Sequence, residues 1–365
     1  MHMNKNNYCV IMAGGIGARF WPMSRTEHPK QFIDILGTGE TLIQRTFKRF
    51  ERVCPAENIL IVTNAIYKDL IKEQIPNIKD ENILCEPSRR NTAPAVAYAA
   101  YKIQKQNPNA NLVVAPSDHI ILKEDQFIEI IESGLKATEK NDWLLTLGIK
   151  PTRPDTGYGY IQFDENNVYS EDKRVRKVKT FTEKPVLDLA KQFLESGDFL
   201  WNAGIFIWSL KSIISAFENH LPEVNAIFKE GLDQYNTKNE QAYIDHGYSI
   251  CRNISIDYGI MEKADNVYTL ESEFGWSDLG TWGSLYDIRE KNENGNTIVG
   301  KNVLAYDAKD CIINMPKDKL VVIQGLEDYI VVEDDGILLI CKKQDEQQIR
   351  QFVNDVKVEK GDKYV

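Results

Sequence analysis

A glycine-rich turn near the N-terminus has the residue types needed to hold a chain of phosphates. The apolar run of residues 8–13 leads directly into Gly14-Gly15-Ile16-Gly17-Ala18-Arg19. Glycines let the backbone turn sharply and approach phosphate oxygens closely. Arg19 adds a planar guanidinium that can pair with the same oxygens. The turn therefore predicts a phosphate-binding loop, although glycines alone are also typical of a structural strand-to-loop turn.

The residues that follow the turn favour a triphosphate. Arg25 and Lys30 lie in the next loop, interleaved with proline and aromatic residues. Together with Arg19 they supply about the positive charge that a triphosphate needs. The turn matches neither common phosphate fingerprint, because Phe20 stands where a dinucleotide fingerprint needs a third glycine and no G-K-[ST] tripeptide occurs.

Further residues downstream could bind a metal or a second phosphate. Asp118 follows the apolar run 111–115, so it is expected at the carboxyl end of a strand, where a carboxylate can hold Mg²⁺ against phosphates. Asp278 precedes a Leu-Gly-Thr turn. Either aspartate could instead cap a helix. Lys184, in a Glu-Lys-Pro segment, is a candidate phosphate cation or a surface charge.

The ordered motifs identify a resemblance. The run from Gly14 to Gln31 resembles the signature of the sugar-1-phosphate nucleotidyltransferases, and its W-P-x-S-R and P-K-Q-F details are similar to the mannose-1-phosphate guanylyltransferase branch. Ala18, His28 and Thr182 depart from the usual residues as tolerated variants. The similarity extends over residues 8–285 through further segments in family order: 86–95, 115–121, 181–185, 201–206, 255–263 and 276–282.

The resemblance implies a role for each matching residue. Arg19, Lys30, Asp118, Lys184 and Asp278 would be catalytic, with Asp118 and Asp278 holding Mg²⁺. The nucleotide would be bound by Ala13, Gly14, Gly15, Gly17, Arg19, Lys30, Glu86, Asn91, Thr92, Ala93, Ser117 and Asp118. The sugar phosphate would be bound by Tyr158, Gly159, Glu183, Lys184, Asn202 and Gly204.

The implied reaction joins GTP and α-D-mannose 1-phosphate to give GDP-mannose and diphosphate. The sugar phosphate attacks the α-phosphorus in line, so catalysis needs positioning and charge neutralisation rather than a protein nucleophile. A heptose or fucose phosphate could replace mannose. Two alternatives remain. One is a non-catalytic sugar-nucleotide sensor, against which the intact charged residues of the predicted catalytic set argue. The other is a nicotinamide-dependent dehydrogenase, against which the absence of the third glycine argues. We expect no phosphomannose isomerase activity, because too few residues follow the matched region.

Bulk composition limits the partners. The net charge of −10 argues against nucleic acid, and no apolar run approaches the roughly 18 residues of a membrane span. The short apolar N-terminal run does not resemble a signal peptide, so we expect a cytoplasmic protein that binds no membrane. None of the six cysteines forms a C-x-x-C pair, which predicts small buried hydrophobes rather than a zinc or redox site.

The elements that must position these residues alternate along the chain. Apolar strands are predicted at 8–13, 58–63, 111–115 and 143–147, with helices at 41–53, 65–74 and 93–105. This order predicts an α/β, Rossmann-like domain with a mostly parallel mixed sheet over residues 1–288, with a strand-rich pocket wall near 157–161 and 204–208. Residues 289–365 are predicted to form a small β-rich domain that ends in a helix over 345–356. A β-helix is one candidate architecture, no repeat is clear, and this domain is a candidate homodimer surface.

Overall fold

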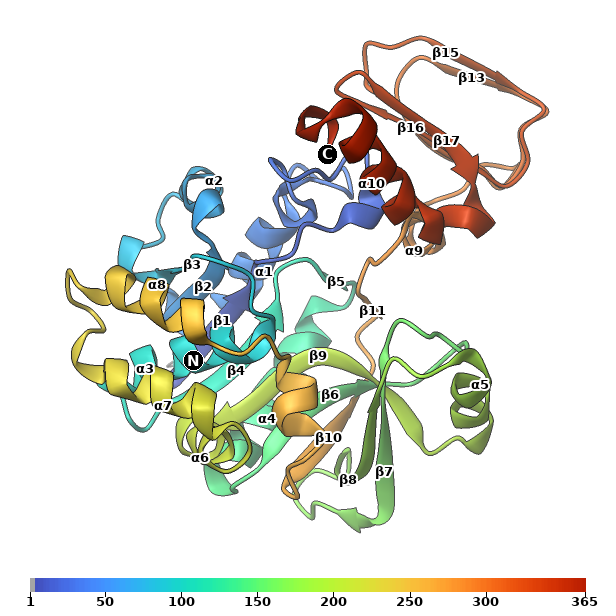
Figure 1. The fold of residues 1–365 in the computed structure, drawn as a ribbon. Helices are drawn as coiled ribbons and strands as arrows, with labels where there is room; N and C mark the ends of the chain where they lie inside the picture. The colour runs from blue at the N-terminus through green and yellow to red at the C-terminus, as the bar shows by residue number, and fades with distance from the viewer. Residues whose placement is uncertain (1–3) are drawn as a thin grey trace. The chain divides into compact units, whose positions relative to one another are not determined.

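The computed structural model describes residues 4–365, which divide into two compact units (Figure 1). The first comprises Met1–Gly14, Thr46–Ser117 and Ile121–Trp276. The second comprises Gly15–Arg45, Asp118–Ile120 and Ser277–Val365. The loop that carries Arg19 and Lys30 therefore belongs to the same unit as Asp118 and Asp278. The two-residue strands β5 (Ile120–Ile121) and β11 (Trp276–Ser277) lie where the chain passes from one unit to the other.

The first unit is built on a nine-stranded sheet in the order β3-β2-β1-β4-β9-β6-β10-β8-β7. β3, β2, β1 and β4 pair in parallel, as do β6 and β10, whereas β9 is antiparallel to both β4 and β6. All strands except β8 and β9 thus run in one direction, which confirms the predicted mixed, mostly parallel sheet. The strands are β1 (Asn7–Met12), β2 (Ile59–Asn64), β3 (Ile83–Glu86), β4 (Asn111–Pro116), β6 (Leu144–Ile149), β7 (Gly159–Val168), β8 (Val175–Glu183), β9 (Phe199–Ser209) and β10 (Val267–Ser272).

Helices cover this sheet. Tyr8 and Val10 of β1 join a core with α3, while Cys9 and Ile11, which point to the other side, are also buried. Strands buried on both faces read as continuous apolar runs, which is the pattern that predicted them. The helices are α1 (Leu42–Phe50), α2 (Lys68–Gln74), α3 (Thr92–Gln106), α4 (Glu124–Lys140), α5 (Leu187–Ser196), α6 (Leu210–His220), α7 (Pro222–Glu230), α8 (Glu240–Ile250), the π-helix η7 (Asp257–Met261) and the 3₁₀ turns η3 (Ala56–Asn58), η4 (Ala65–Tyr67), η5 (Asp80–Asn82) and η6 (Gly231–Asp233).

The predicted elements of this unit are confirmed with shifted ends. The helix expected over 65–74 starts as the 3₁₀ turn η4, because Asn64 accepts the Ile66 amide and caps the chain there. The strand expected at 204–208 is the central part of β9, which is longer by several residues. Its antiparallel insertion between β4 and β6 was not predicted, because pairing direction between strands distant in sequence leaves no local pattern.

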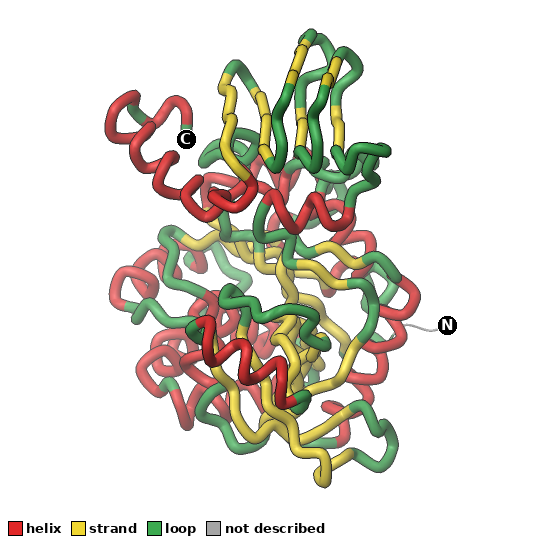
Figure 2. Tube along the Cα trace, turned by 90° about the vertical axis from the view of Figure 1, so that its right-hand side faces the viewer, coloured by secondary structure: helices red, strands yellow, loops and turns green. Residues whose placement is uncertain are grey.

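The C-terminal part of the second unit is a stack of short strands (Figure 2). β12, β14 and β16 pair in parallel, β13 and β15 pair in parallel, and β17 closes the stack antiparallel to β16. This confirms the small β-rich domain. Its elements are β12 (Thr297–Val299), β13 (Val303–Tyr306), β14 (Ile312–Asn314), β15 (Val321–Gln324), β16 (Tyr329–Asp334) and β17 (Ile337–Lys342), followed by η8 (Lys343–Gln348), α10 (Ile349–Lys360) and η9 (Asp362–Tyr364).

The stack carries a repeat of 18 residues that the sequence analysis missed. Val303 pairs with Val321 and Ile312 with Ile330, each 18 positions apart. The left-handed corners recur at the same interval: Asp310 and Asp328 have φ values of 51° and 60°. Two residues of each turn are identical, in Asp-Ala-Lys-Asp-Cys-Ile (307–312) and Gly-Leu-Glu-Asp-Tyr-Ile (325–330). The repeated aspartates, Asp310 and Asp328, and the repeated isoleucines, Ile312 and Ile330, were the sequence signal for this repeat. Two copies of a repeat are too few to be recognised by eye.

The cysteine prediction is confirmed. All six cysteines are free and buried, and burial raises the pKa of the Cys54 thiol to about 12. Among residues 4–365, no helix is long and apolar enough to cross a membrane.

Candidate active site

The glycine-rich loop folds back on the Lys30 segment within the second unit. Gly17 has a φ of 74°, and a Cβ atom there would lie 2.6 Å from Lys30 Cβ. The Lys30 amide donates to the Ile16 carbonyl at 3.1 Å, and Gln31 Nε2 donates to the Gly15 carbonyl at 2.9 Å. Only glycine fits both the left-handed conformation and the close approach. The loop is therefore closed by the residues of its own motif.

Lys30 brings the two predicted metal ligands together. Its Nζ lies 2.8 Å from Asp118 Oδ2 and donates to the carbonyl oxygens of Asp278 and Leu279 at 3.0 and 2.9 Å. An ammonium has three N–H donors, so all of them are used. The Lys30 side chain is 4% exposed. Burial alone would raise the pKa of the Asp118 carboxyl, but the charges of Lys30 and His119 and the hydrogen bonds that the carboxyl accepts together hold that pKa below its ordinary value.

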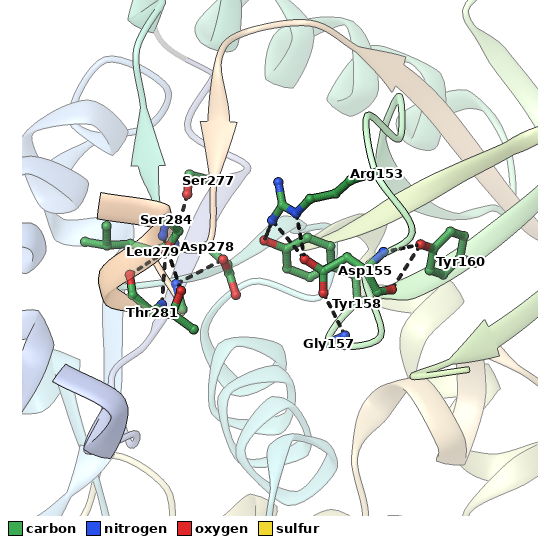
Figure 3. A network of polar contacts seen from close by, with 11 residues as sticks. Arg153, Asp155, Gly157, Tyr158, Tyr160, Ser277, Asp278, Leu279, Thr281 and Ser284 are labelled. Carbon is green, nitrogen blue, oxygen red and sulfur yellow. Dashed lines mark hydrogen bonds and ion pairs between the residues drawn. The ribbon is translucent and has the colours of Figure 1, made fainter. Parts of the chain in front are cut away.

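Neither aspartate caps a helix. Thr281 is the N-cap of α9 (Trp282–Ile288), in a reciprocal pair of hydrogen bonds with Ser284. Asp278 instead accepts the Gly280 amide at 3.0 Å in the preceding turn, where Leu279 is left-handed (Figure 3). The N-cap of α4 is Lys123, not Asp118. The helix-cap explanation is therefore wrong for both residues.

The basic residues of the loop divide into two kinds. Arg19 makes no hydrogen bond or ion pair within the described chain. Arg25 pairs with Asp335 at 2.9 Å and with Asp334 at 3.5 Å, at the turn between β16 and β17. The position of Arg25 in the sequence suggested a contact with the triphosphate. In the structure this arginine is instead paired with two aspartates of the protein. His28 lies in the same loop, with Nε2 3.2 Å from the Phe32 carbonyl, as expected of a satisfied loop histidine.

Several predicted nucleotide residues meet in the first unit, at the carboxyl ends of β1, β3 and β4. A Cβ atom on Gly14 would lie 3.3 Å from Glu86 Oε2, so the glycine permits this carboxyl to approach the end of β1. Ala13 is hydrogen-bonded to β2 through its amide. The Ser117 amide donates to the Met12 carbonyl at 3.0 Å. These contacts place Ala13, Gly14, Glu86 and Ser117 at one edge of the sheet.

Glu86 has an unusual environment for a carboxyl group. It is buried and accepts a hydrogen bond from the Tyr248 hydroxyl at 2.8 Å. Burial raises the pKa of Glu86 to about 7, against the smaller opposing effects of Tyr248 and Arg89. A carboxyl in that state can exchange between donor and acceptor near neutral pH.

The residues at the start of α3 form hydrogen bonds with the protein chain. Asn91 has a φ of 66° and caps the helix through the Thr92 amide. The Thr92 hydroxyl accepts the Ile256 amide at 2.9 Å, and the Ala93 amide donates to the Ile254 carbonyl at 3.1 Å. These predicted nucleotide residues therefore also fix the chain at 254–256.

The predicted sugar-phosphate residues also converge, in the first unit. Glu183 ends β8, and Lys184 follows with a φ of 48° and its Nζ 2.5 Å from Glu183 Oε1. The other oxygen, Glu183 Oε2, is buried without a hydrogen-bond partner in residues 4–365. A Cβ atom on Gly159 would lie 2.4 Å from it. A buried acceptor left open beside a lysine is suited to a hydroxyl-rich, phosphorylated ligand.

Asn202 is fixed by three contacts. Its Oδ1 accepts the Thr146 hydroxyl at 2.8 Å and the Gly204 amide at 3.1 Å, while Nδ2 donates to Asp257 Oδ1 at 2.9 Å. Asp257, on η7, was not singled out from the sequence, although it lies in the matched segment 255–263. Burial and then the Glu183 charge raise its pKa to about 7. A carboxylate inside a matched motif was the signal that could have found it.

Aromatic rings form the predicted wall. Tyr158 packs edge-on against Trp201 and Trp276, with ring centroids 4.9 and 5.2 Å apart. The Arg153 guanidinium lies over the Trp201 ring. It also pairs with Asp155 at 2.8 Å (Figure 3). The Tyr158 carbonyl also accepts the Lys184 amide at 3.2 Å. The wall thus connects directly to the Glu183–Lys184 segment.

Comparison with known proteins shows the family of the chain. A family pattern described as Nucleotidyl transferase matches residues 8–295, which span most of the chain. The chain belongs to the nucleotidyl transferase family. A second pattern, described as a MannoseP isomerase/GMP-like beta-helix domain, matches residues 301–356 of this nucleotidyl transferase. It accounts for the stacked strands.

Curated relatives of this nucleotidyl transferase match along nearly the whole chain. A mannose-1-phosphate guanylyltransferase of Salmonella montevideo is 34% identical over 361 residues, covering 98% of this chain and 75% of the relative. The alginate biosynthesis protein AlgA of Pseudomonas aeruginosa is 34% identical over 352 residues, covering 95% and 71%. Among solved structures, one named mannose-1-phosphate geranyltransferase, from Thermus thermophilus, superposes with a TM-score of 0.85 at 27% identity, covering 96% of this chain and 99% of that chain.

Proposed function

We propose that this nucleotidyl transferase is a mannose-1-phosphate guanylyltransferase, which converts GTP and α-D-mannose 1-phosphate into GDP-mannose and diphosphate. The observation that carries the proposal is the convergence on Lys30, which holds Asp118 through its carboxylate and Asp278 through its backbone carbonyl. The guanylyltransferase relatives, at 32–34% identity, support the choice of substrates. The reacting sugar phosphate forms a bond to the α-phosphorus, and the bond to the diphosphate breaks.

The residues around Lys30 fit Mg²⁺. Asp118 and Asp278 offer two carboxylates, and no group of three or more His, Cys, Asp and Glu side chains in the described chain forms a closed metal cage. Mg²⁺ is held in this way, by one or two carboxylates with phosphate oxygens and water completing its octahedron. When bound, Mg²⁺ would neutralise charge at the α-phosphate. Lys30 holds the Asp118 carboxylate and the Asp278 backbone in place, and Arg19 is free to bind the leaving diphosphate.

The sugar phosphate would occupy the site around Glu183. Lys184 would pair with its phosphate, and Glu183 Oε2 would accept a sugar hydroxyl. Asn202, held by Thr146, Gly204 and Asp257, has one amide hydrogen left for another hydroxyl. Tyr158, Gly159 and Gly204 would border the ring. Glu86 would accept from the guanine, with Ala13, Gly14, Gly15, Gly17, Asn91, Thr92, Ala93 and Ser117 completing the nucleotide site.

A substrate matrix tests the proposal. GTP, ATP and UTP are each combined with the 1-phosphates of mannose, glucose and fucose and with a heptose phosphate, and diphosphate release is measured. We expect turnover with GTP and mannose 1-phosphate to exceed the other pairs by at least about tenfold. Preference for fucose or heptose phosphate would replace the sugar in the proposal, and absence of all turnover would favour a sensor.

The domain and oligomer assignments complete the proposal. Residues 1–288 are assigned to catalysis and 289–365 to the C-terminal β domain, although the segment Gly15–Arg45 belongs to the same compact unit as the C-terminal residues.

A homodimer through the β domain is supported by its exposed apolar side chains: Leu304, Tyr306, Val322, Leu338 and Ile340. Sedimentation of the wild type against Leu304→Lys/Val322→Lys tests it, with a monomeric wild type as the contrary result.

A further inference from the structure

The end of the chain holds the phosphate loop within the second unit. Trp21 Nε1 donates to the Tyr364 carbonyl at 2.7 Å. Phe20 and Trp21 share an apolar cluster with Ile349 and Phe352 of α10. The helix α10 packs against η1 (Ala18–Phe20), the turn that contains Arg19. The two residues that follow Arg19 are therefore fixed by the C-terminal helices.

A carboxylate from η8 holds the segment that follows Asp278. Glu346 Oε2 accepts the Gly283 amide at 2.7 Å. A Cβ atom on Gly283 would lie 3.2 Å from both carboxylate oxygens, so the glycine makes room for the acid. The positive charge of Arg19 acts on Glu346 as well. Glu346 thus connects the start of α9 with the phosphate loop.

Arg350 follows Ile349 on α10, the helix that packs against the turn of Arg19, so the two positive charges act on each other. Burial and the Arg19 charge both lower the pKa of Arg350. Neither arginine side chain forms a hydrogen bond or an ion pair within residues 4–365, and Glu346 Oε2 is bonded to the Gly283 amide. Two neighbouring like charges without a paired counter-charge repel each other and favour a bound anion. Guanidinium groups bind phosphate oxygens in a bidentate manner, so a phosphate chain suits the pair.

We propose that Arg350 binds the terminal phosphates of the nucleotide together with Arg19, and that Glu346 is a positioning residue for this two-guanidinium site. The C-terminal helix would then supply part of the active site rather than only a support. The inference rests on the proposed function, because it takes Arg19 to face the diphosphate.

The reverse reaction isolates this site, because diphosphate and the sugar nucleotide are then separate substrates. We expect Arg350→Gln to raise the KM for diphosphate about 10- to 100-fold, as for a lost charge-assisted contact, with the KM for GDP-mannose within about twofold. Arg350→Lys should be intermediate. Lys360→Gln, at the far end of the same helix, removes the same charge and should change neither KM. An unchanged KM for diphosphate in Arg350→Gln would overturn the proposal, as would an equal rise in both KM values.

Glu346 variants test the positioning role. Glu346→Gln keeps an oxygen for the Gly283 amide, so it should retain more kcat than Glu346→Ala at similar melting temperature. Equal losses in both, tracking melting temperature, would leave Glu346 a structural residue only and refute its positioning role. Calorimetric titration of wild type and Arg350→Gln with diphosphate alone separates the two ideas. Weaker binding in Arg350→Gln supports the site even if mannose 1-phosphate proves to be the wrong substrate, whereas equal binding in an active wild type refutes only this inference.

Discussion

Lys30 and Asp118 form an ion pair in which the Lys30 side chain is buried, with Nζ 2.8 Å from Oδ2, and the same ammonium binds the backbone carbonyl of Asp278. The two aspartates are 160 positions apart in the sequence. Both are proposed to bind the same metal, but Lys30 contacts the side chain of Asp118 and the main chain of Asp278. This difference gives them separable effects on activity and on stability.

Removing either carboxylate should cripple turnover. If both hold one Mg²⁺, Asp118→Asn and Asp278→Asn should each reduce kcat by about 100-fold or more, because several kcal/mol of charge stabilisation are lost. The double variant should be little worse than the weaker single variant, because residues that act as one unit are not additive. Steady-state rates at saturating Mg²⁺ measure this. Losses that multiply, or wild-type activity that survives a chelator, would contradict a shared metal.

Stability should separate the same two variants. Asp118→Asn leaves the Lys30 ammonium, 4% exposed, without its counter-charge, so it should lower the free energy of unfolding by about 1.5–3 kcal/mol. Asp278→Asn keeps the carbonyl that Lys30 binds, so its melting temperature should stay near that of the wild type. Thermal unfolding of both variants checks the order, and a larger loss in Asp278→Asn would contradict the geometry.

Lys184→Ala should damage use of the sugar phosphate. Loss of one cation from a bound phosphate should cost about 2–4 kcal/mol in kcat/KM for mannose 1-phosphate, while GTP affinity is unchanged. Lys191→Ala, an exposed lysine on α5 paired with Asp188, is the matched control. Calorimetry with each substrate decides; GTP affinity lost with sugar-phosphate affinity intact would show the assignment to be wrong.

The elements that carry the candidate site could be predicted from the sequence better than the contacts that support it. The turn at Gly14–Arg19 and the strands at 8–13 and 111–115, the second of which precedes Asp118, follow from local patterns, because a buried parallel strand and a glycine turn each have a signature in a few residues. Asp257 and Arg350 escaped notice. Asp257 is bonded to Asn202, and the helix of Arg350 packs against the turn of Arg19. These contacts join segments far apart in the sequence and leave no periodic trace. The partnership of Arg25 with Asp334 and Asp335 was hidden for the same reason.

The buried Glu86 carboxyl gives a prediction in pH. Its pKa is raised from 4.5 to about 7 in the folded protein, so the folded state binds more protons than the unfolded state between these values. Stability of the wild type should therefore fall as pH rises through this window, by up to roughly 3 kcal/mol, and level off above it. Glu86→Gln resembles the protonated acid and has no such dependence.

The measurement is the melting temperature of Glu86→Gln and wild type at pH 5 and pH 8. The two should be close at pH 5, and the variant should be the more stable at pH 8. Asp245→Asn, an exposed carboxylate on the neighbouring helix α8, is a control that should show no such crossover. Glu86→Gln should also reduce the preference for GTP over ATP about tenfold, because the carboxylate proposed to accept hydrogen bonds from guanine becomes an amide. A pH-independent difference in melting temperature would show that Glu86 is ionised throughout, and unchanged nucleotide preference would place guanine recognition elsewhere.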